Sequence, residues 1–492
     1  MNPAIVTAAA IPLAIIPRPL SLVETGGVLK LSARDTVKVV QACKAWDARG
    51  FAKLSAPANP GDEAYRLEIG PRSIRIGARS QAGRFRALAT LRQILPAVPG
   101  KGGISLPCVR IEDAPRFGWR GFLLDCGRHY MPVPFIKRVI DLMALYKFNR
   151  FHWHLTEDQG WRLEIRRHPP LTRIGAWRTQ VNPEGPVKRY GGFYTQAEAR
   201  EIVRYASARG IVVVPEIELP GHCQAALAAY PALSCTGGPF TVSNEWGIHK
   251  DVYCAGNDKT FSLLEDVLTE VVKVFPGPFI HLGADEVPKD RWKACPKCQA
   301  RIKAEGLADE NALQTWFVNR VIRFLATKNR RAICWDEILE GGAPADVIVQ
   351  VWRADQKAVS QAARAGHDVI HSPYSHTYLN YGLAGYWMDL KWVHGWEPAV
   401  EGDPPEKAAR IGAAEAERLL GGEACLWTEG VEEPGVFPQI LPRILPVAEN
   451  LWSPEAGKQW EEFSGRAEAH RARLEAQGIS VGASVYTEPV KE

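Results

Sequence analysis

The chain has 492 residues, of which 46% are hydrophobic, and its formal net charge is +5. This length predicts two or three domains with large apolar cores. The small charge and the lack of a long Lys/Arg run argue against nucleic acid as a partner, and no apolar run is long enough to predict a membrane span.

The chain begins with an apolar segment, MNPAIVTAAAIPLAIIP, that has no Lys or Arg in front of it. A signal peptide normally carries such a charge. We interpret residues 1–14 as a flexible leader or a trimmed export signal. The compartment stays open, with a periplasmic or secreted location favoured over a cytoplasmic one.

Residues 15–114 are expected to form a small N-terminal α+β domain. AYRLEIG and SIRIGAR alternate apolar and polar residues as half-buried strands do, and SQAGRFRALATLRQIL follows with helical spacing. One helix is expected in this domain. The Gly- and Pro-rich segment that ends in EDAPRFGWRG is taken as the boundary to the next domain.

Residues 115–492 alternate short apolar runs with helical segments, which is typical of a parallel sheet. The eight expected strands are GFLLDCG, RFHWHLTED, IVVVPEIEL, FIHLGADEV, RAICWDEI, VIVQVWR, DVIHSP and EACLWTE. Eight βα repeats predict an α/β fold, a (β/α)8 TIM-like barrel with a C-terminal helix. A doubly wound sheet is the alternative, but no Gly-rich phosphate turn follows the first strand.

The carboxyl ends of the strands, where such a barrel carries its active site, are rich in acids, aromatic residues and Arg. They supply Asp125, Arg128, His152, His154, Glu157, Asp158, Glu216, Glu218, His222, His281, Asp285, Glu286, Trp335, Asp336, Glu337, Trp352, Arg353, Trp427 and Glu429, with Tyr374, Tyr378 and Asn380 close behind and Arg120 at the start of the first strand. Carboxylates and Arg hydrogen-bond hydroxyl groups, and aromatic faces pack against sugar rings. The mixture predicts a carbohydrate site.

The adjacent carboxylates Asp285 and Glu286 raise a geometric question, because neighbouring side chains on a strand point to opposite faces. Either one of them is a structural ion-pair member, or the strand leaves its pleat there. We expect the second arrangement, with both carboxylates reaching one pocket.

Metal chemistry is the main alternative within enzymes. A zinc site of the amidohydrolase kind could use His152, His154, Glu218, His222, Asp285 and Glu286. The H-x-H pair there normally follows the first strand, however, and so many acids and Trp residues are less typical of it. We expect no metal in the active site and no cofactor.

The ten cysteines are too few for a disulfide scaffold at this length. Cys295 and Cys298 form CPKC, and Cys235 and Cys254 bracket a glycine-containing loop. Whether either pair forms a disulfide stays open. A single CxxC lacks the second half of a zinc site, so zinc is not predicted here either.

Six segments in order, WRGFLLDCGRHY, FHWHLTEDQGWR, VPEIELPGH, IHLGADEVPKDRWKACPKCQ, WDEILEGG and LWTEG, resemble the signature blocks of glycoside hydrolase family 20, the β-N-acetylhexosaminidases. The resemblance covers nearly the whole chain. It implies an exo-acting, retaining enzyme that removes terminal β-linked GlcNAc, or GalNAc, from glycans or chitooligosaccharides. In this family the 2-acetamido group of the substrate attacks the anomeric carbon and forms an oxazolinium ion.

The resemblance also implies roles for single residues. Glu286 is the general acid and then the base, with a pKa raised by burial beside Asp285. Asp285 holds the acetamido N–H and balances the developing positive charge. His222 and Asp158 support the acid, and Tyr378 donates its hydroxyl to the acetamido oxygen.

The remaining implied residues bind the sugar. Trp335, Trp352 and Trp427 wall the acetamido pocket, and Arg120 and Glu429 clamp the hydroxyl groups. The chain departs from the family pattern at Ala284 and Asn380, which stand where Gly and Asp are usual, and in VQVWRA around Trp352. Asn380 leaves open the hydroxyl preference and the balance between hydrolysis and transfer to another sugar.

Three functional hypotheses follow. The leading one is the exo-acting hydrolase. A transglycosylating or lacto-N-biose-type member of the family would differ in the loops on the aglycone side, and product profiling with lactose as acceptor separates it. A non-catalytic glycan-binding protein on the same scaffold would show no turnover, and the intact Asp285–Glu286 pair argues against it.

Overall fold

The structure is a computed structural model and describes residues 13–57, 59, 61–98, 100, 102–180, 188–354, 356–381, 388–403 and 407–482. The expected leader at residues 1–14 therefore lies almost entirely outside the described part. The described residues form two compact units, one from residues up to Pro115 together with Ser453–Val481, and one from Arg116–Trp452 with Gly482.

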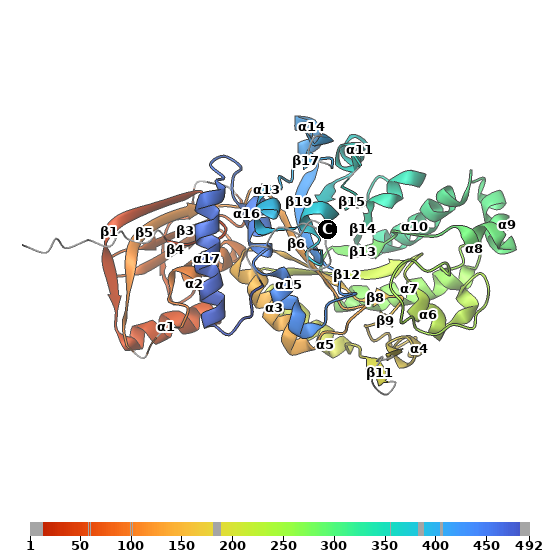
Figure 1. Cartoon of the computed structure of the whole chain (residues 1–492), viewed down its shortest axis with the longest axis horizontal. Helices are drawn as coiled ribbons and strands as arrows, with labels where there is room; N and C mark the ends of the chain where they lie inside the picture. Colours follow the sequence, from red (N-terminus) through yellow and green to blue (C-terminus); the bar gives the residue numbers. More distant parts are fainter. Residues whose placement is uncertain are drawn as a thin grey trace, which may run out of the picture. The chain divides into compact units, whose positions relative to one another are not determined.

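The first unit is a five-stranded sheet with three helices (Figure 1). Its elements are β1 (Ser21–Leu31), α1 (Ala33–Lys44), β2 (Ala52–Lys53), β3 (Tyr65–Ile69), β4 (Ile74–Ala78), α2 (Gln81–Ile94), β5 (Ile104–Asp113) and α17 (Trp460–Ala476). The strand order is β1-β5-β3-β4-β2. The α+β fold agrees with the prediction, but α1 was not expected, and β5 occupies the segment that was interpreted as a linker.

Helix α17 belongs to the first unit, whereas the sequence analysis placed a C-terminal helix with the barrel. The guanidinium of Arg473 on α17 donates to the carbonyl oxygens of Leu95 at 2.7 Å and Gln93 at 3.2 Å. These carbonyls end α2, where a helix has unpaired acceptors and a negative dipole end. Figure 1 shows the blue α17 beside the orange α2. Only the folded chain reveals such a long-range contact.

The second unit is a closed barrel of eight parallel strands, in the order β12-β13-β14-β15-β16-β19-β6-β7, and every predicted strand is present. The strands are β6 (Trp119–Asp125), β7 (Arg150–His154), β12 (Val212–Leu219), β13 (Phe279–Gly283), β14 (Arg331–Trp335), β15 (Ile348–Val351), β16 (Val369–His371) and β19 (Leu419–Leu426). They are buried on both faces, which is why each reads as a nearly continuous apolar run. The TIM-like prediction is confirmed.

Helices and short hairpins connect the barrel strands. The helices are α3 (Val133–Leu145), α4 (Pro170–Arg173), α5 (Gln196–Ser207), α6 (Gln224–Ala229), η1 (Pro231–Leu233), α7 (Asp258–Val274), α8 (Asp290–Ala294), α9 (Pro296–Glu305), α10 (Glu310–Thr327), η2 (Asp336–Gly341), α11 (Ala358–Arg364), α12 (Tyr374–Thr377), α13 (Leu390–Gly395), α14 (Ala413–Ala416), α15 (Glu433–Ile440) and α16 (Ile444–Trp452). The short strands are β8 (Thr156–Glu157), β9 (Gly160–Trp161), β10 (Trp177–Gln180), β11 (Lys188–Gly191), β17 (Val400–Glu401) and β18 (Ala409–Arg410). No helix in the described ranges combines the length and the apolar character needed to cross a bilayer.

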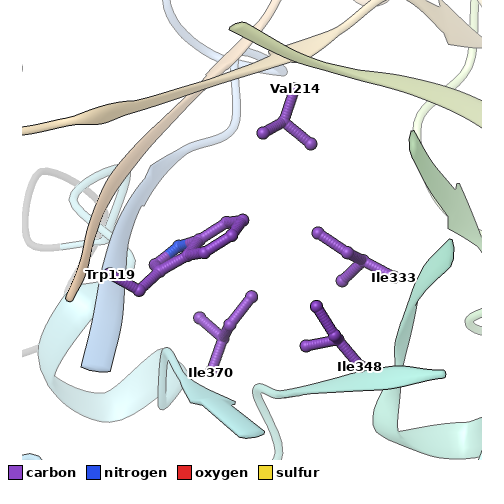
Figure 2. Packing of buried hydrophobic residues seen from close by; sticks show 5 residues of the cluster. All are labelled: Trp119, Val214, Ile333, Ile348 and Ile370. Atoms are coloured by element: carbon purple, nitrogen blue, oxygen red, sulfur yellow. The ribbon is translucent and has the colours of Figure 1, made fainter. Parts of the chain in front are cut away.

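The barrel interior begins with an apolar layer from five different strands. Figure 2 shows Trp119, Val214, Ile333, Ile348 and Ile370 pointing toward one another, and all five are at most 2% exposed. A packed layer of this kind closes one end of the barrel and leaves the other end for a binding site.

A polar layer lies among the inward-facing residues further along the strands. The carboxylate of Glu216 is 2.7 Å from His281 Nδ1, and that of Glu423 is 2.7 Å from His152 Nδ1. His152 Nε2 joins the two halves at 3.1 Å from Glu216. These buried acids are therefore fully engaged as structural ion-pair members.

Candidate active site

A cavity of about 550 Å³ opens where the barrel strands end. A cavity of this size suits a small ligand. Its lining contains acids, aromatic residues and one arginine: Arg128, Glu157, His222, Asp285, Glu286, Trp335, Trp352, Tyr378, Asn380, Tyr381, Trp427, Glu429, Gly430, Val431 and Gln439. Nine of the eleven residues predicted for the site line it, and the two exceptions are Asp158 and Arg120.

The chain leaves the regular pleat directly after β13. Gly283, Ala284 and Glu286 have φ angles of 64°, 72° and 48°, which lie in the left-handed region. Gln314 on α10 donates to the Ala284 carbonyl at 2.8 Å and holds the turn. Both Asp285 and Glu286 consequently reach the cavity, as the adjacency of the two acids predicted.

Glycine is required at position 283. A Cβ atom there would lie 1.8 Å from a carboxylate oxygen of Glu218, in addition to the unfavourable φ. The close approach puts the buried Glu218 carboxyl directly against the turn that carries the acid pair. Neither oxygen of Glu218 has a hydrogen-bond partner among the described residues.

The carboxyl group of Asp285 makes few hydrogen bonds within the described residues. Its Oδ1 is buried and has no hydrogen-bond partner within the described chain, and its Oδ2 is 3.7 Å from His222 Nε2. Burial raises its pKa to about 7, His222 opposes the shift and the carboxylate of Glu286 adds to it. Burial, followed by the charge of Asp285, also raises the pKa values of Glu218 and Glu337 well above the usual range.

His222 connects the acid pair to two further carboxylates. Its Nδ1 is 2.8 Å from Glu157 and 3.2 Å from Asp158, and its Nε2 is 3.5 Å from Glu286 Oε2. Burial alone would lower the pKa of His222, but Glu157, Asp158 and Glu286 outweigh burial and hold it well above its ordinary value. Asp158 lies behind His222 rather than on the cavity surface, so it can act only through the histidine.

Three tryptophans and two tyrosines form the aromatic wall. The Trp335 and Trp427 rings are 6.0 Å apart between centroids, and Tyr378 lies 6.0 Å from Trp427 and stacks on Trp352 at 6.2 Å. The indole N–H of Trp335 donates to Glu216 at 3.0 Å. The wall therefore rests on the polar layer of the barrel interior. The three predicted Trp residues and Tyr378 do converge here.

A cluster around Arg128 forms another side of the cavity. Its guanidinium is 3.1 Å from Glu157, 3.4 Å from Asp125 and 3.6 Å from Glu429. It also lies over the Trp427 ring, 5.1 Å from the centroid. Glu429 is about one-third exposed, which leaves its carboxylate available to a ligand.

Arg120 does not belong to the site, contrary to the prediction. It is 1% exposed, its guanidinium donates to the carbonyls of Lys147 and Phe117, and it stacks over Trp452. It lies near the start of β6, at the end of the strand remote from the cavity. Side chains alternate along a strand, and Trp119 next to it faces the interior, so Arg120 faces outward to α16. Arg128 is the arginine that lines the cavity.

The residues proposed for an active-site zinc do not all gather at the cavity. His222, Asp285 and Glu286 line it, but His152, His154 and Glu218 lie beneath it in the barrel interior. Both ring nitrogens of His154 face carboxylates, those of Glu216 and Glu157. His152 and His154 are thus engaged in ion pairs of the interior, whereas the ligand atoms of His222, Asp285 and Glu286 lie within 4.8 Å of one another at the cavity.

Six lining residues were not among the predicted site residues, namely Arg128, Glu157, Tyr381, Gly430, Val431 and Gln439. Tyr381 stacks on Tyr378 at 6.0 Å, Glu157 links Arg128 to His222, and Gln439 comes from α15. The sequence analysis named Glu157 and Arg128 among the polar residues at the strand ends but assigned them no role in the site. Gln439 lies on α15, after the last barrel strand, and no sequence motif pointed to it.

The fold and the cavity together define a TIM-barrel enzyme with a sugar-binding site built around an acid pair. The profile described as "Glycosyl hydrolase family 20, catalytic domain" matches residues 117–455, and that of "domain 2" of the same family matches residues 49–114. A β-hexosaminidase of Porphyromonas gingivalis is 39% identical over 95% of this chain and 64% of its own length. One of Vibrio furnissii is 35% identical over 89% of this chain and 76% of its own length.

Solved structures of other proteins are similar to this chain over nearly its whole length. A β-N-acetylhexosaminidase of Bacteroides fragilis has a TM-score of 0.82 and 35% identity, and covers 96% of this chain and 97% of its own. A Streptomyces plicatus β-hexosaminidase in complex with the product GlcNAc has a TM-score of 0.81 and 30% identity, over 95% and 96%. The chain therefore belongs to glycoside hydrolase family 20, the family of the β-N-acetylhexosaminidases.

Proposed function

We propose that the protein is an exo-acting, retaining β-N-acetylhexosaminidase that removes terminal β-linked GlcNAc by substrate-assisted catalysis. One observation carries the proposal. Asp285 and Glu286 leave β13 on a left-handed turn and enter one aromatic-walled cavity beside His222. This arrangement lets a proton donor and a second carboxylate of the protein act on the same sugar.

Glu286 donates a proton to the glycosidic oxygen as the bond to the anomeric carbon breaks. The acetamido oxygen of the substrate attacks that carbon from the other side and gives an oxazolinium ion. Water then opens the ion with Glu286 as general base, and two inversions retain the configuration. His222, 3.5 Å from Glu286, links this proton transfer to Glu157 and Asp158.

Asp285 accepts a hydrogen bond from the acetamido N–H and faces the positive charge that develops on the ring. Its pKa of about 7 reflects burial, which the nearby His222 offsets only in part. An oxazolinium ion nearby adds positive charge, so Asp285 becomes more acidic as the reaction proceeds. The interaction strengthens toward the transition state, which is the condition for catalysis.

The aromatic wall orients the nucleophile. Trp335, Trp352 and Trp427 pack against the acetamido methyl group and exclude water, and the Tyr378 hydroxyl donates to the acetamido oxygen. Arg128 and Glu429 bind ring hydroxyls, which transfers to Arg128 the role first expected of Arg120.

The sugar is inferred from chemistry and from relatives. An acetamido nucleophile requires a 2-acetamido sugar, and related structures from Vibrio harveyi and Streptomyces plicatus contain N-acetylglucosamine. Another relative of known structure is a chitobiase of Flavobacterium johnsoniae, which supports chitooligosaccharides as a substrate class. The choice between GlcNAc and GalNAc concerns one hydroxyl orientation, and a panel of both glycosides decides it.

The direct test is release of a chromogenic aglycone from a β-GlcNAc glycoside. Wild-type protein should turn over, and Glu286→Gln should lose about 10²–10⁴-fold in kcat/KM, the typical contribution of a general acid. Glu468→Gln, at an exposed glutamate of α17, is the matched control and should retain full activity. Absence of turnover in the wild type would favour a glycan-binding protein, and wild-type turnover in Glu286→Gln would refute the role of Glu286.

A further inference from the structure

Four cysteines from two loops meet at one point of the barrel unit. Cys235 follows η1, Cys254 precedes α7, and Cys295 and Cys298 flank the start of α9. Their sulfur atoms all lie within 4.8 Å of one another. Three are buried and Cys235 is half-buried, and all four are thiols rather than disulfides.

The sulfur–sulfur distances have the spacing of a tetrahedral site. Cys235–Cys298, Cys254–Cys295 and Cys254–Cys298 are 3.7, 3.8 and 3.6 Å apart. A disulfide requires about 2.05 Å, and a zinc ion with about 2.3 Å bonds to four thiolates separates the sulfurs by about 3.8 Å. Cys254 and Cys298 each have two sulfurs at this distance, so the four do not divide into two pairs.

We propose that Cys235, Cys254, Cys295 and Cys298 bind one zinc ion as a closed tetrathiolate site. Zinc suits four thiolates in a tetrahedron, and four protein ligands leave no open position for a substrate or water. The site is structural and separate from the catalytic cavity, whose lining includes none of these cysteines.

The surrounding backbone fits this arrangement. A Cβ atom at Gly256 would lie 2.2 Å from the carbonyl carbon of Lys297, so only glycine lets the Cys254 loop press against the CPKC turn. The backbone N–H of Cys254 donates to the Leu233 carbonyl at 2.8 Å, which fixes its position next to Cys235.

The zinc site would tie together the two loops that carry the catalytic groups. One loop runs from His222 to Cys254 after β12, and the other from Asp285 to Cys298 after β13. One hydrogen bond joins the two loops, from Trp292 Nε1 to the Tyr253 carbonyl at 2.9 Å, and a second, from the Tyr253 N–H to the Pro220 carbonyl at 3.0 Å, ties Tyr253 to the segment just before His222. The ion would therefore hold His222 in register with Glu286 without touching the substrate.

The first test is metal content, which does not depend on the proposed reaction. Protein purified in reductant without chelator should contain about one zinc per chain by elemental mass spectrometry. Cys298→Ser should lose the zinc, and Cys108→Ala, at a buried cysteine of the first unit, should keep it. Cobalt exchanged into the wild type should give thiolate charge-transfer bands and the intense visible absorption of tetrahedral coordination, and Cys298→Ser should give neither.

A second pair of variants covers the case in which Cys298→Ser does not fold. Cys235 is half-buried, so Cys235→Ser should fold but lose zinc, whereas Cys235→His should retain it because imidazole also binds zinc. Hydrogen exchange should increase first in residues 223–257 and 286–298 when the metal is removed. Wild type without stoichiometric metal, with iron instead of zinc, or with disulfides among these cysteines by non-reducing intact-mass analysis would overturn the proposal.

Discussion

The two sets of buried carboxylates in the barrel show opposite electrostatics. In the interior, Glu216 lies among His152, His154 and His281 and accepts from Trp335; burial alone would raise its pKa, but the histidines hold it well below its usual range. At the cavity, one oxygen of Asp285 has no hydrogen-bond partner among the described residues, and burial raises its pKa to about 7. The comparison teaches that two buried carboxylates of one barrel differ in their pKa because Glu216 is surrounded by donors, whereas Asp285 keeps an oxygen available to a ligand in the cavity.

The largest expected effect is that a substitution in the interior set lowers stability, whereas a substitution in the cavity set removes activity. Glu216→Gln should lower the free energy of unfolding by about 3–5 kcal/mol, because it removes the charge that the buried His152 and His154 share and leaves each with a single carboxylate partner. Glu286→Gln should leave the denaturant midpoint close to that of the wild type and remove activity. Chemical denaturation and turnover measurements on both variants check this. A Glu216→Gln variant that is stable but inactive would contradict a structural role for Glu216.

Asp285→Asn sharpens the comparison at the cavity itself. The variant should lose about 10²–10³-fold in kcat with little change in the fold, because it removes the charge opposite the oxazolinium ion. Steady-state kinetics with a β-GlcNAc glycoside measure the loss. A variant with near-wild-type kcat would show that Asp285 does not meet the developing charge.

The same substitution tests the raised pKa through stability. The folded-state pKa of Asp285, about 7, lies above its ordinary value of 3.8, so the folded protein binds this proton more tightly. The contribution to stability is complete below about pH 4 and is lost as the pH rises through 7. The free energy of unfolding of the wild type relative to Asp285→Asn should therefore decrease between pH 5 and pH 8, measured by urea denaturation at each pH, and a difference that rises with pH would contradict the assignment.

Arg128 and Arg120 offer a matched pair with a smaller effect. Arg128→Lys loses the fork that faces Glu157 and Glu429 and should reduce kcat/KM by about 10–100-fold, the value of one or two charge-assisted contacts. Arg120→Lys should alter the thermal midpoint and leave KM unchanged, since its contacts are backbone carbonyls and Trp452. Equal effects of the two variants on KM would contradict the placement of the sugar.

The smallest effect is expected at Asn380, whose Oδ1 has no hydrogen-bond partner in the described part of the cavity. Asn380→Asp restores the residue usual in the family and should change the ratio of GlcNAc to GalNAc hydrolysis by a few-fold, because one hydrogen bond to a hydroxyl becomes charge-assisted. Product profiling with lactose as acceptor shows whether transfer changes as well. An unaltered ratio and product profile would remove Asn380 from sugar recognition.

Much of the fold followed from the sequence because the barrel strands are short, buried and therefore apolar. Their carboxyl ends gave the acids and aromatic residues of the cavity, and the adjacency of Asp285 and Glu286 predicted the departure from the pleat. Arg120 came from the family resemblance and not from the strand geometry, which already put it at the wrong end of β6. The residue roles themselves stay predictions.

Other features depend on contacts that no local pattern encodes. Helix α17 joins the first unit through Arg473, although almost the whole barrel separates it from α2 in sequence. CPKC alone did not predict a zinc site, because Cys235 and Cys254 lie in another loop and the four sulfur atoms meet only in the folded chain. The placement of α17 and the cysteine cluster could not be predicted because the residues that meet are far apart in the sequence.

The central claim is that the acetamido group of the substrate is the nucleophile, and inhibition by a thiazoline analogue of the oxazolinium ion tests it most directly. The inhibition constant should be at least about 10²-fold lower than that of free GlcNAc, because the analogue resembles the intermediate that Asp285 and Tyr378 are placed to stabilise. A thiazoline that binds no more tightly than GlcNAc would contradict the account.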